Sequence, residues 1–415
     1  MDITFNSPAV RAQVRAISSK SEAHRALICA SLSDRETKII CTDTNADIDA
    51  TASCLSALGA KITRVADGFE VSPIGTVTSG ASLDANESGS TLRFLLPLVS
   101  ALGADCEFIM RGRLASRPLS PLYELLTGNG VTISEVGKSP LSVSGKLLSG
   151  EYTLEANISS QYISGMLFAL SVADGKSILR LSGKIESAPY ILMTLDTLRA
   201  FGAEIEFDAE SNIFYINGKE RLVSPSTFTV GGDWSNAAFM LVAGAIGVSS
   251  VSISGLDTES RQGDRAVISV LREMGAEIEF GKGKITVYPS RLHGISIDAA
   301  DIPDLVPILS VAAAVAEGET VIYNASRLRL KESDRIESVC ATLSALGADI
   351  RATNDGMIIC GKARLSGGEV DSFNDHRIAM SAAVASLVCD GAVTVSRFEA
   401  INKSVPTFLE NFESI

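Results

Sequence analysis

The chain lacks any apolar run long enough to cross a membrane. Its longest uncharged apolar stretches, residues 237–248 and 305–316, have 12 residues each, whereas a spanning helix needs about 20. The N-terminus also lacks the continuous apolar core of a signal peptide. We therefore expect a cytoplasmic protein with no membrane partner, in which these two stretches form buried helices.

Histidine is scarce, with three copies, and the seven cysteines are irregularly spaced with no CxxC pair. A zinc site needs clustered cysteine and histidine ligands, and a disulfide framework needs an even, patterned set of cysteines. The sequence therefore predicts no metal site, and reduced cysteines that pack as small apolar side chains.

Basic residues are outnumbered, 36 against 49 acidic ones, which leaves a net charge of −13. This balance argues against a nucleic-acid partner, because such partners select a basic surface. An acidic protein can still bind small anions if its cations gather in one place, so the positions of lysine and arginine become decisive.

A repeat of about 72 residues runs along the chain. The pattern Leu-x-x-x-Gly-Ala/Val-x-Ile occurs five times, with its glycines 71 to 73 residues apart at Gly59, Gly130, Gly202, Gly275 and Gly347. An apolar helix ended by glycine and followed by alternating apolar residues predicts a C-capped helix leading into a strand.

A second series of segments keeps the same phase. Small-residue apolar helices are expected to begin near Lys20, Ser88, Ser159, Asp233, Asp304 and Asp375. Helices that are apolar all round are expected to be buried, and most of these first residues suit a helix N-cap. The two series together predict an α/β fold of six units, each with two helices and about four strands in βαβαββ order.

The sixth unit differs at its end. A helix is predicted over residues 405–415 with no strand after it, whereas residues 3–14 look like strands and can supply the missing piece. This predicts one domain of residues 1–16 plus 229–415 and a second of residues 17–228, each with three units.

Polar residues gather where the buried helices begin. A helix N-terminus carries unpaired N–H groups and a partial positive charge, so several together form an anion site. Four of the six starts carry cation or amide donors, and two loops add Arg111, Arg113 and Arg117, and Arg327, Arg329, Lys331 and Arg335. We expect Lys331 and Arg335, four residues apart, to share one helix face. Any single start is explained by capping alone, but six in phase favour an anion site.

Nine segments resemble, in order and spacing, the motifs of the EPSP synthase (3-phosphoshikimate 1-carboxyvinyltransferase) family. They are KSEAHRAL, NESGSTLR, RLASRPL, SSQYISGML, ESAPYI, DIPDLVP, RLKESDR, NDHRIAM and INKSVPTF. The resemblance implies a two-domain inside-out α/β barrel of six βαβαββ units with its active site in the cleft between the domains. It also implies transfer of the enolpyruvyl group of phosphoenolpyruvate to the 5-hydroxyl of 3-phosphoshikimate in the shikimate pathway, through a tetrahedral intermediate. No cofactor is needed, a monomer is expected, and glyphosate is the expected inhibitor.

The resemblance also assigns roles to residues. For 3-phosphoshikimate they are Lys20, Ser21, Arg25, Ser159, Ser160, Gln161, Ser187, Tyr190, Asp304, Arg327 and Lys331. For phosphoenolpyruvate they are Lys20, Gly89, Arg113, Gln161, Arg335, Arg377 and Lys403.

The implied catalytic set is Asp304, Glu332, Lys20, Lys403 and His376. Asp304 would take the hydroxyl proton, and Glu332 and Lys403 would serve C3 of the enol or the departing phosphate; which residue donates which proton stays open. Such a reaction needs an acid and a base with separated pKa values. Two positions depart from the family pattern, because Glu87 and Arg327 stand where many members have Asn. Glu87 would need a cation partner, Lys20 or Arg93.

Three other functions fit the fold. A transferase acting on UDP-N-acetylglucosamine needs a reactive cysteine in the loop 111–118, which has none. An RNA-end cyclase should show a basic face and a nucleophilic histidine, for which His24 and His293 offer no suitable setting. A non-catalytic anion-binding relative would not need to retain Lys20, Asp304, Glu332 and Lys403.

Overall fold

The computed structural model describes residues 1–6 and 8–414. The chain forms two compact units, which we call the first unit (Ser18–Val230) and the second unit (Met1–Ile17 with Gly231–Ile415). The backbone passes from one to the other twice, after residue 17 and after residue 230.

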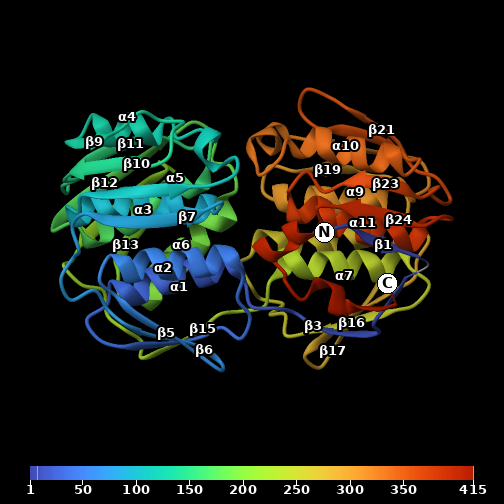
Figure 1. Ribbon diagram of the computed structural model, residues 1–415, viewed down its shortest axis with the longest axis horizontal. Coiled ribbons are helices and arrows are strands. Elements are labelled where there is room, and N and C mark those ends of the chain that lie inside the picture. Colours follow the sequence, from blue (N-terminus) through green and yellow to red (C-terminus); the bar gives the residue numbers. More distant parts are fainter. Residues whose placement is uncertain (7, 415) are drawn as a thin grey trace. The chain divides into compact units, whose positions relative to one another are not determined.

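The first unit contains three sheets and two sets of helices (Figure 1). The buried helices are α1 (Lys20–Ser31), α3 (Gly89–Leu102) and α5 (Ser160–Val172), and the more exposed ones are α2 (Ala46–Ala57), α4 (Leu122–Thr127) and α6 (Ala188–Ala200). A 3-10 turn, η1 (Leu114–Ser116), precedes α4. The strands are β4 (Thr37–Ile40), β5 (Lys61–Val65), β6 (Gly68–Ser72), β7 (Ala81–Asn86), β8 (Cys106–Met110), β9 (Val131–Ile133), β10 (Leu141–Gly145), β11 (Glu151–Glu155), β12 (Gly175–Ser182), β13 (Glu204–Asp208), β14 (Ile213–Gly218) and β15 (Thr227–Thr229).

The second unit follows the same plan. Its buried helices are α7 (Trp234–Ile246), α9 (Val306–Ala314) and α11 (His376–Ala385), with α8 (Val267–Glu273) and α10 (Arg335–Ala345) outside them. The 3-10 turns are η2 (Gly263–Ala266), η3 (Pro303–Leu305), η4 (Ser326–Leu330), η5 (Ser386–Val388), η6 (Phe398–Lys403) and η7 (Phe408–Asn411). The strands are β1 (Ile3–Phe5), β2 (Ala9–Val10), β3 (Gln13–Arg15), β16 (Val251–Ser254), β17 (Glu277–Gly281), β18 (Lys284–Tyr288), β19 (Ser296–Asp298), β20 (Glu319–Tyr323), β21 (Asp349–Ala352), β22 (Met357–Cys360), β23 (Gly368–Asp371), β24 (Val393–Ser396) and β25 (Phe412–Ser414).

Five of the sheets have four strands and one topology. Their orders are β15-β4-β6-β5, β7-β8-β10-β9, β11-β12-β14-β13, β17-β18-β16-β3 and β19-β20-β22-β21. In each, one pair is parallel and the others are antiparallel, as in β7 with β8, β8 with β10 and β10 with β9. Parallel strands need a crossover connection, and the buried helices α3, α5 and α9 make that crossover for β7 with β8, β11 with β12 and β19 with β20. The predicted βαβαββ units are confirmed.

Two of the sheets take a strand from a distant part of the chain. Strand β15 comes at the end of the first unit but pairs in parallel with β4, its first sheet strand. Strand β3 comes before the first unit but pairs in parallel with β16 of the second unit. These two strands lie at the two crossings, so each unit is closed by residues next to the point where the chain leaves or enters it.

The N-terminal residues complete the sixth sheet, as the sequence predicted. Strand β1 pairs with β24 in the sheet β1-β24-β23. The side chain of Phe5 is fully buried, with its ring centroid 5.6 Å from that of Phe398 and 5.5 Å from that of Phe412.

The predicted helix over residues 405–415 is wrong. The structure has the 3-10 turn η7 followed by β25, which pairs antiparallel with β2; Ile415 lies outside the described residues. Pro406 disfavours a helical residue before it, and the backbone of Asn411 accepts a hydrogen bond from Arg11 N at 2.9 Å instead. A distant segment therefore decides the conformation of this end.

Four of the five repeat glycines directly follow the C-caps of their helices, as predicted, whereas α4 is capped by Gly128, two residues before Gly130. All five have positive φ, between 72° and 114°, a region in which glycine alone avoids a steric penalty. Strands β5, β9, β13, β17 and β21 follow them.

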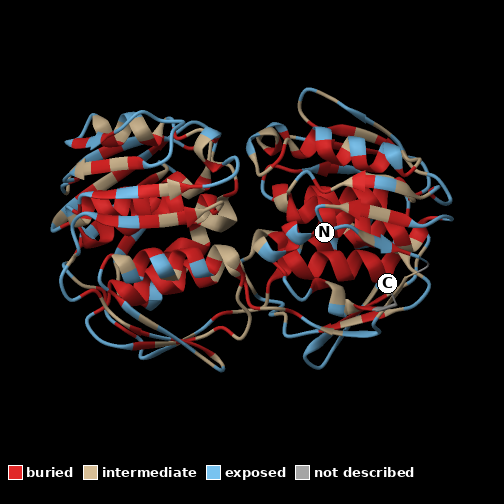
Figure 2. Ribbon diagram, in the orientation of Figure 1, coloured by how far each residue is buried: buried red, intermediate tan, exposed pale blue. Residues whose placement is uncertain are grey.

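The predicted all-round burial of the second helix series is also confirmed. Every residue of α9 is buried, as are residues 234–245 of α7, and Figure 2 shows these helices as the red interior of each unit. Helices with small residues can pack this deeply because their backbones approach closely.

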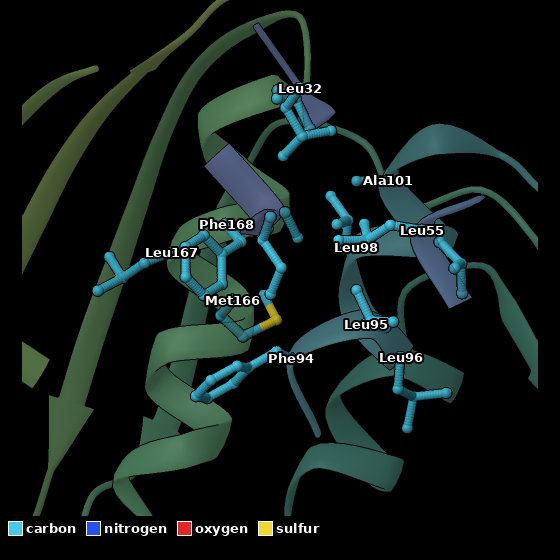
Figure 3. Packing of buried hydrophobic residues seen from close by; sticks show 14 of the residues in the cluster. Leu32, Leu55, Phe94, Leu95, Leu96, Leu98, Ala101, Met166, Leu167 and Phe168 are labelled. Carbon is cyan, nitrogen blue, oxygen red and sulfur yellow. The ribbon is translucent and has the colours of Figure 1, made fainter. Parts of the chain in front are cut away.

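Helices α3 and α5 pack closely against each other (Figure 3). Phe94, Leu95 and Leu98 of α3 lie among Met166, Leu167 and Phe168 of α5, and the rings of Phe94 and Phe168 are 5.5 Å apart. A Cβ on Gly165 of α5 would lie 2.3 Å from the carbonyl oxygen of Arg93 in α3. This contact has no room for a side chain.

Replacing Gly165 with alanine should therefore force α3 and α5 apart. We expect Gly165→Ala to lower the free energy of unfolding by about 1 to 3 kcal/mol, as overpacking does. Gly75→Ala is the control, because nothing lies within 4 Å of a Cβ at that position. Urea denaturation measures both, and equal stability of the two variants would contradict the close-packing account.

Candidate active site

Three helix starts of the first unit carry a set of polar side chains. The N-caps of α1, α3 and α5 are Ser19, Ser88 and Ser159, and each side chain accepts a hydrogen bond from its own first turn. Capping therefore explains these serines locally, as the simpler interpretation held. The residues that follow them join α3 to α5 and α1 to α6.

Arg93 and Gln161 join α3 to α5. Arg93 donates from Nη1 to Gln161 Oε1 at 2.7 Å and from Nη2 to the carbonyl of Pro118 at 3.2 Å. Gln161 donates in turn from Nε2 to Ser90 Oγ at 2.9 Å. The predicted ligand Gln161 is thus held in one orientation by its neighbours.

Arg25 joins α1 to α6. It is 2 % exposed and donates from Nε to Thr194 Oγ1 at 2.8 Å, from Nη2 to the carbonyl of Tyr190 at 2.9 Å and from Nη1 to the carbonyl of Ser21. Burial lowers the pKa of Arg25 to about 10, so it stays charged at neutral pH. Its donors organise the backbone on both sides of it.

Other predicted residues of this unit lie at the same helix starts. Lys20 is the first residue of α1, with its Nζ 2.8 Å from Asp47 Oδ2. Ser160 is buried in the first turn of α5. Ser187 is buried just before α6 with φ of 54°, a left-handed conformation that costs energy for serine and recurs at functional sites.

The arginine next to Gly89 is Arg117, which the predicted ligand set left out. Arg117 is buried, and a Cβ on Gly89 would lie 2.7 Å from its Nη1. The predicted ligand Arg113 is exposed on the same loop. Glu87 packs against Gly112, the residue directly before Arg113, because a Cβ on Gly112 would lie 2.5 Å from Glu87 Oε2.

A cluster of charged residues in the second unit surrounds Asp304, and we call it the Asp304 cluster (Asp304, Lys331, Glu332, Arg335, Asp375 and Arg377). Asp304 Oδ1 accepts from Arg335 Nη1 at 2.8 Å and from Lys331 Nζ at 3.3 Å. Its Oδ2 accepts from Arg377 Nη2 at 3.1 Å. Three cations therefore meet at one carboxylate.

Arg335 is the centre of this cluster. Its side chain is 1 % exposed and also donates to Glu332 Oε2 at 2.8 Å and from Nε to Asp375 Oδ2 at 2.8 Å. Burial alone would lower the pKa of Arg335, but Asp375, Glu332 and Asp304 outweigh it and raise the pKa. Burial likewise opposes ionisation of Asp375, yet Arg335 keeps the pKa of Asp375 below its usual value.

Lys331 reaches the cluster from outside a helix. Helix α10 begins at Arg335 with Asp334 as its N-cap, so the predicted shared helix face of Lys331 and Arg335 is wrong. Both still contact Asp304, because the turn that follows η4 bends Lys331 toward it. Burial lowers the pKa of Lys331, although Asp304 opposes that shift.

Asp264 was missed from the sequence. It is 1 % exposed at the end of a Gln-Gly-Asp segment in η2, and it accepts a hydrogen bond from Ser235 Oγ of α7. Burial and then the charge of Asp304 raise the pKa of Asp264 to about 6, against the opposing effect of Arg377. No local pattern marks this residue, since only the folded unit brings it near Asp304.

The remaining predicted residues of the second unit lie in its turns and first helical residues. Lys403 ends η6 and donates from Nζ to the carbonyl of Asn374 at 2.7 Å. His376 is buried at the start of α11, with Nδ1 3.9 Å from Asp375 Oδ1. Arg327 donates from Nη2 to the carbonyl of Ala300 at 2.7 Å. Within residues 1–6 and 8–414, no helix is long and apolar enough to span a membrane.

Comparison with known proteins identifies the family of the chain. Residues 6–412 match the family model described as EPSP synthase (3-phosphoshikimate 1-carboxyvinyltransferase). The chain belongs to the EPSP synthase family.

Individual relatives agree over the whole length. A 3-phosphoshikimate 1-carboxyvinyltransferase of Clostridium novyi is 41% identical over 408 residues, which are 96% of this chain and 93% of the relative. One from Clostridium kluyveri is 39% identical and covers 100% of this chain and 97% of its own. The structure of EPSP synthase from Acinetobacter baumannii superposes with a TM-score of 0.80 at 28% identity, covering 99% of this chain and 96% of that one.

The contribution of the Asp304 cluster to the stability of this EPSP synthase family member can be tested by removing Arg335. Arg335→Met would leave Asp304, Glu332 and Asp375 without their shared cation. We expect it to lower the free energy of unfolding by about 3 to 5 kcal/mol, the usual cost of breaking a buried pair.

The control for this EPSP synthase family member is Arg364→Met, which removes an exposed partner of Asp390. That change should stay within about 1 kcal/mol, as exposed pairs do. Guanidinium denaturation measures both variants, and a similar loss in the two would show that the buried network stabilises nothing.

Asp264 predicts a pH dependence of stability. Its carboxyl pKa is raised in the folded state, so the stability it contributes is full below about pH 4 and is lost as pH rises through about 6. Asp264→Asn should therefore gain stability relative to the unaltered protein between pH 4 and 7, by at most about 3 kcal/mol.

Thermal unfolding at several pH values measures that difference. Asp349→Asn, an exposed change on β21, is the control and should show a difference that does not vary with pH. A pH-independent difference for Asp264→Asn would contradict the raised pKa.

Proposed function

We propose that this chain transfers the enolpyruvyl group of phosphoenolpyruvate to the 5-hydroxyl of 3-phosphoshikimate and releases phosphate, with residues of both units taking part. The observation that carries the proposal is the Asp304 cluster, where a carboxylate able to accept a proton is held among three cations able to bind an anion. Both substrates are polyanions, and a transfer between them needs this combination.

The first unit supplies most contacts to 3-phosphoshikimate in this proposal. Arg25 and Gln161 are already fixed by hydrogen bonds to Thr194, Tyr190, Arg93 and Ser90. Preorganised donors lose little conformational freedom when a ligand binds. The proposed set is Lys20, Ser21, Arg25, Ser159, Ser160, Gln161, Ser187 and Tyr190, with Asp304, Arg327 and Lys331 from the second unit.

Phosphoenolpyruvate binds, we propose, through Lys20, Gly89, Gln161, Arg335, Arg377 and Lys403. To these we add Arg117, because its guanidinium is buried against Gly89 and arginine suits bidentate contacts to carboxylate and phosphate. Arg113, exposed on the same loop, stays a prediction of the family resemblance. Glyphosate is proposed to compete at this site, where a Cβ on Gly89 would lie 2.7 Å from Arg117 Nη1.

The proton transfers follow from the same groups. Asp304 takes the proton of the 5-hydroxyl while the hydroxyl oxygen bonds to C2 of phosphoenolpyruvate. At the same time C3 gains a proton from Glu332 or Lys403. The resulting tetrahedral intermediate then loses phosphate and a C3 proton. The cations around Asp304 stabilise the charge that develops on the phosphate, and Lys20 and His376 complete the proposed catalytic set. We further propose a cytoplasmic monomer.

Removing the base tests the proposal. Asp304→Asn keeps the size of the side chain but cannot accept the hydroxyl proton, so we expect kcat to fall by about 100- to 10,000-fold, the range of general-base losses. The assay is phosphate release with phosphoenolpyruvate and 3-phosphoshikimate, and Asp349→Asn is the control with unchanged kcat.

The acceptor substrate is tested in the same assay. The proposal predicts phosphate release with 3-phosphoshikimate and none with UDP-N-acetylglucosamine as the acceptor. Release with only the latter would reject it, as would an Asp304→Asn enzyme with full activity.

A further inference from the structure

Four buried polar side chains form a chain of hydrogen bonds inside the first unit that the proposed mechanism does not use. His24 Nδ1 of α1 lies 2.7 Å from Thr51 Oγ1 of α2, which lies 2.7 Å from Thr91 Oγ1 of α3. Thr91 Oγ1 donates to Ser88 Oγ at 2.8 Å. His24, Thr51 and Thr91 are 0 % exposed and Ser88 is 1 % exposed. The chain ends one residue before Gly89.

The direction of this chain can be worked out from its protons. A hydroxyl has one proton to donate, and Thr91 gives its proton to Ser88. The contact between Thr51 and Thr91 then requires Thr51 to be the donor. Thr51 in turn has no proton left for His24, so His24 must carry its proton on Nδ1 and donate to Thr51.

The opposite direction would break contacts that the structure makes. With the proton of His24 on Nε2, Thr51 would donate to Nδ1. Because Thr91 gives its own proton to Ser88, no proton would then lie between the oxygens of Thr51 and Thr91, which are 2.7 Å apart. An Nε2 proton would also be buried without an acceptor among the described residues. A buried unmatched polar group of this kind is costly.

His24 is neutral, so its one ring proton is the proton that the chain of hydrogen bonds uses. Burial, followed by the charges of Lys20 and Arg25, keeps the pKa of His24 well below its usual value. A neutral imidazole has a single N–H, which the hydrogen bonds place on Nδ1.

Ser88 is the last acceptor in this chain of hydrogen bonds. Its oxygen accepts from Thr91 Oγ1 and from Thr91 N at 3.2 Å, so both of its lone pairs are occupied. Its own proton has no acceptor within the part of the chain that the structure describes. Ser88 thus retains one hydroxyl proton to donate, at the start of α3.

We propose that His24 is a positioning residue whose Nδ1–H, acting through Thr51 and Thr91, keeps the Ser88 hydroxyl as a hydrogen-bond donor for the phosphoenolpyruvate anion at Gly89. The inference rests on the proposed function of Gly89 and names a donor that this function did not include. His24 itself touches no substrate; it sets the direction in which the hydroxyls point.

Thr51→Val tests the chain at a link that touches no substrate. Valine keeps the shape of threonine but interrupts the hydrogen bonds, so the KM for phosphoenolpyruvate should rise about 3- to 10-fold, as expected for loss of one oriented donor to an anion. The KM for 3-phosphoshikimate should not change. Thr51→Ser keeps the hydroxyl and should restore the lower KM.

Thr197→Val is the matched control. Thr197 is buried in α6 and donates only to the carbonyl of Met193, at 2.9 Å. Both valine variants should lower Tm, but only Thr51→Val should raise the KM for phosphoenolpyruvate. Equal KM values for the two variants would overturn the inference while leaving the proposed function intact.

The tautomer of His24 is a second test that needs no substrate. In protein with 15N-labelled histidine, the side-chain spectrum should show the proton of His24 on Nδ1 over the whole range from pH 6 to 8. A proton on Nε2 would overturn the inference. If the unaltered protein releases no phosphate with both substrates, the proposed function and this inference fail together.

Discussion

The close contact between the backbones of α3 and α5 at Gly165 is the constraint on which the first unit's site depends. Because a Cβ at Gly165 would lie 2.3 Å from the carbonyl of Arg93, the two helices meet with no side chain between them. That contact brings Arg93 within 2.7 Å of Gln161 and so fixes the predicted ligand. A helix buried on all sides can present polar groups to a ligand only at its ends, which is why the predicted binding residues gather at helix starts.

The charge of the molecule poses a second constraint. With a net charge of −13, the protein as a whole repels polyanions, so its binding cations must be local. In the Asp304 cluster they are held in place by carboxylates, and Arg335 alone contacts Asp304, Glu332 and Asp375. An arriving phosphate or carboxylate can take over some of these contacts without assembling the cations anew, and this limits the reorganisation that catalysis requires.

Much of the fold was predictable from the sequence because the features of the repeat are determined locally. Helix caps, glycine ends and all-apolar helices are decided by a few neighbouring residues, so α1, α3 and α7 begin where the sequence indicates. Most of the failures have a different cause, although the shared face predicted for Lys331 and Arg335 failed because the N-cap of α10 lies between them. The C-terminal segment became a strand because β2 pairs with it, and Asp264 and Arg117 became site candidates through burial by distant elements. Apart from Pro406, which disfavours a helical residue before it, such long-range contacts leave no mark on the local sequence.

The two units present their polar groups in different ways, and the difference matches what each has to do. The first unit works mainly with hydrogen bonds. In it, His24, Thr51 and Thr91 orient one another's hydroxyl groups without any proton being transferred. The second holds the carboxylate of Asp304 among cations, and in the proposed function that carboxylate accepts a proton. A group that orients a ligand must keep its protons, whereas a catalytic base must be able to gain one. Burial makes His24 neutral and constant, and partial exposure leaves Asp304 and Glu332 accessible to a substrate. In the proposed function, orientation and proton transfer therefore belong to separate parts of the chain.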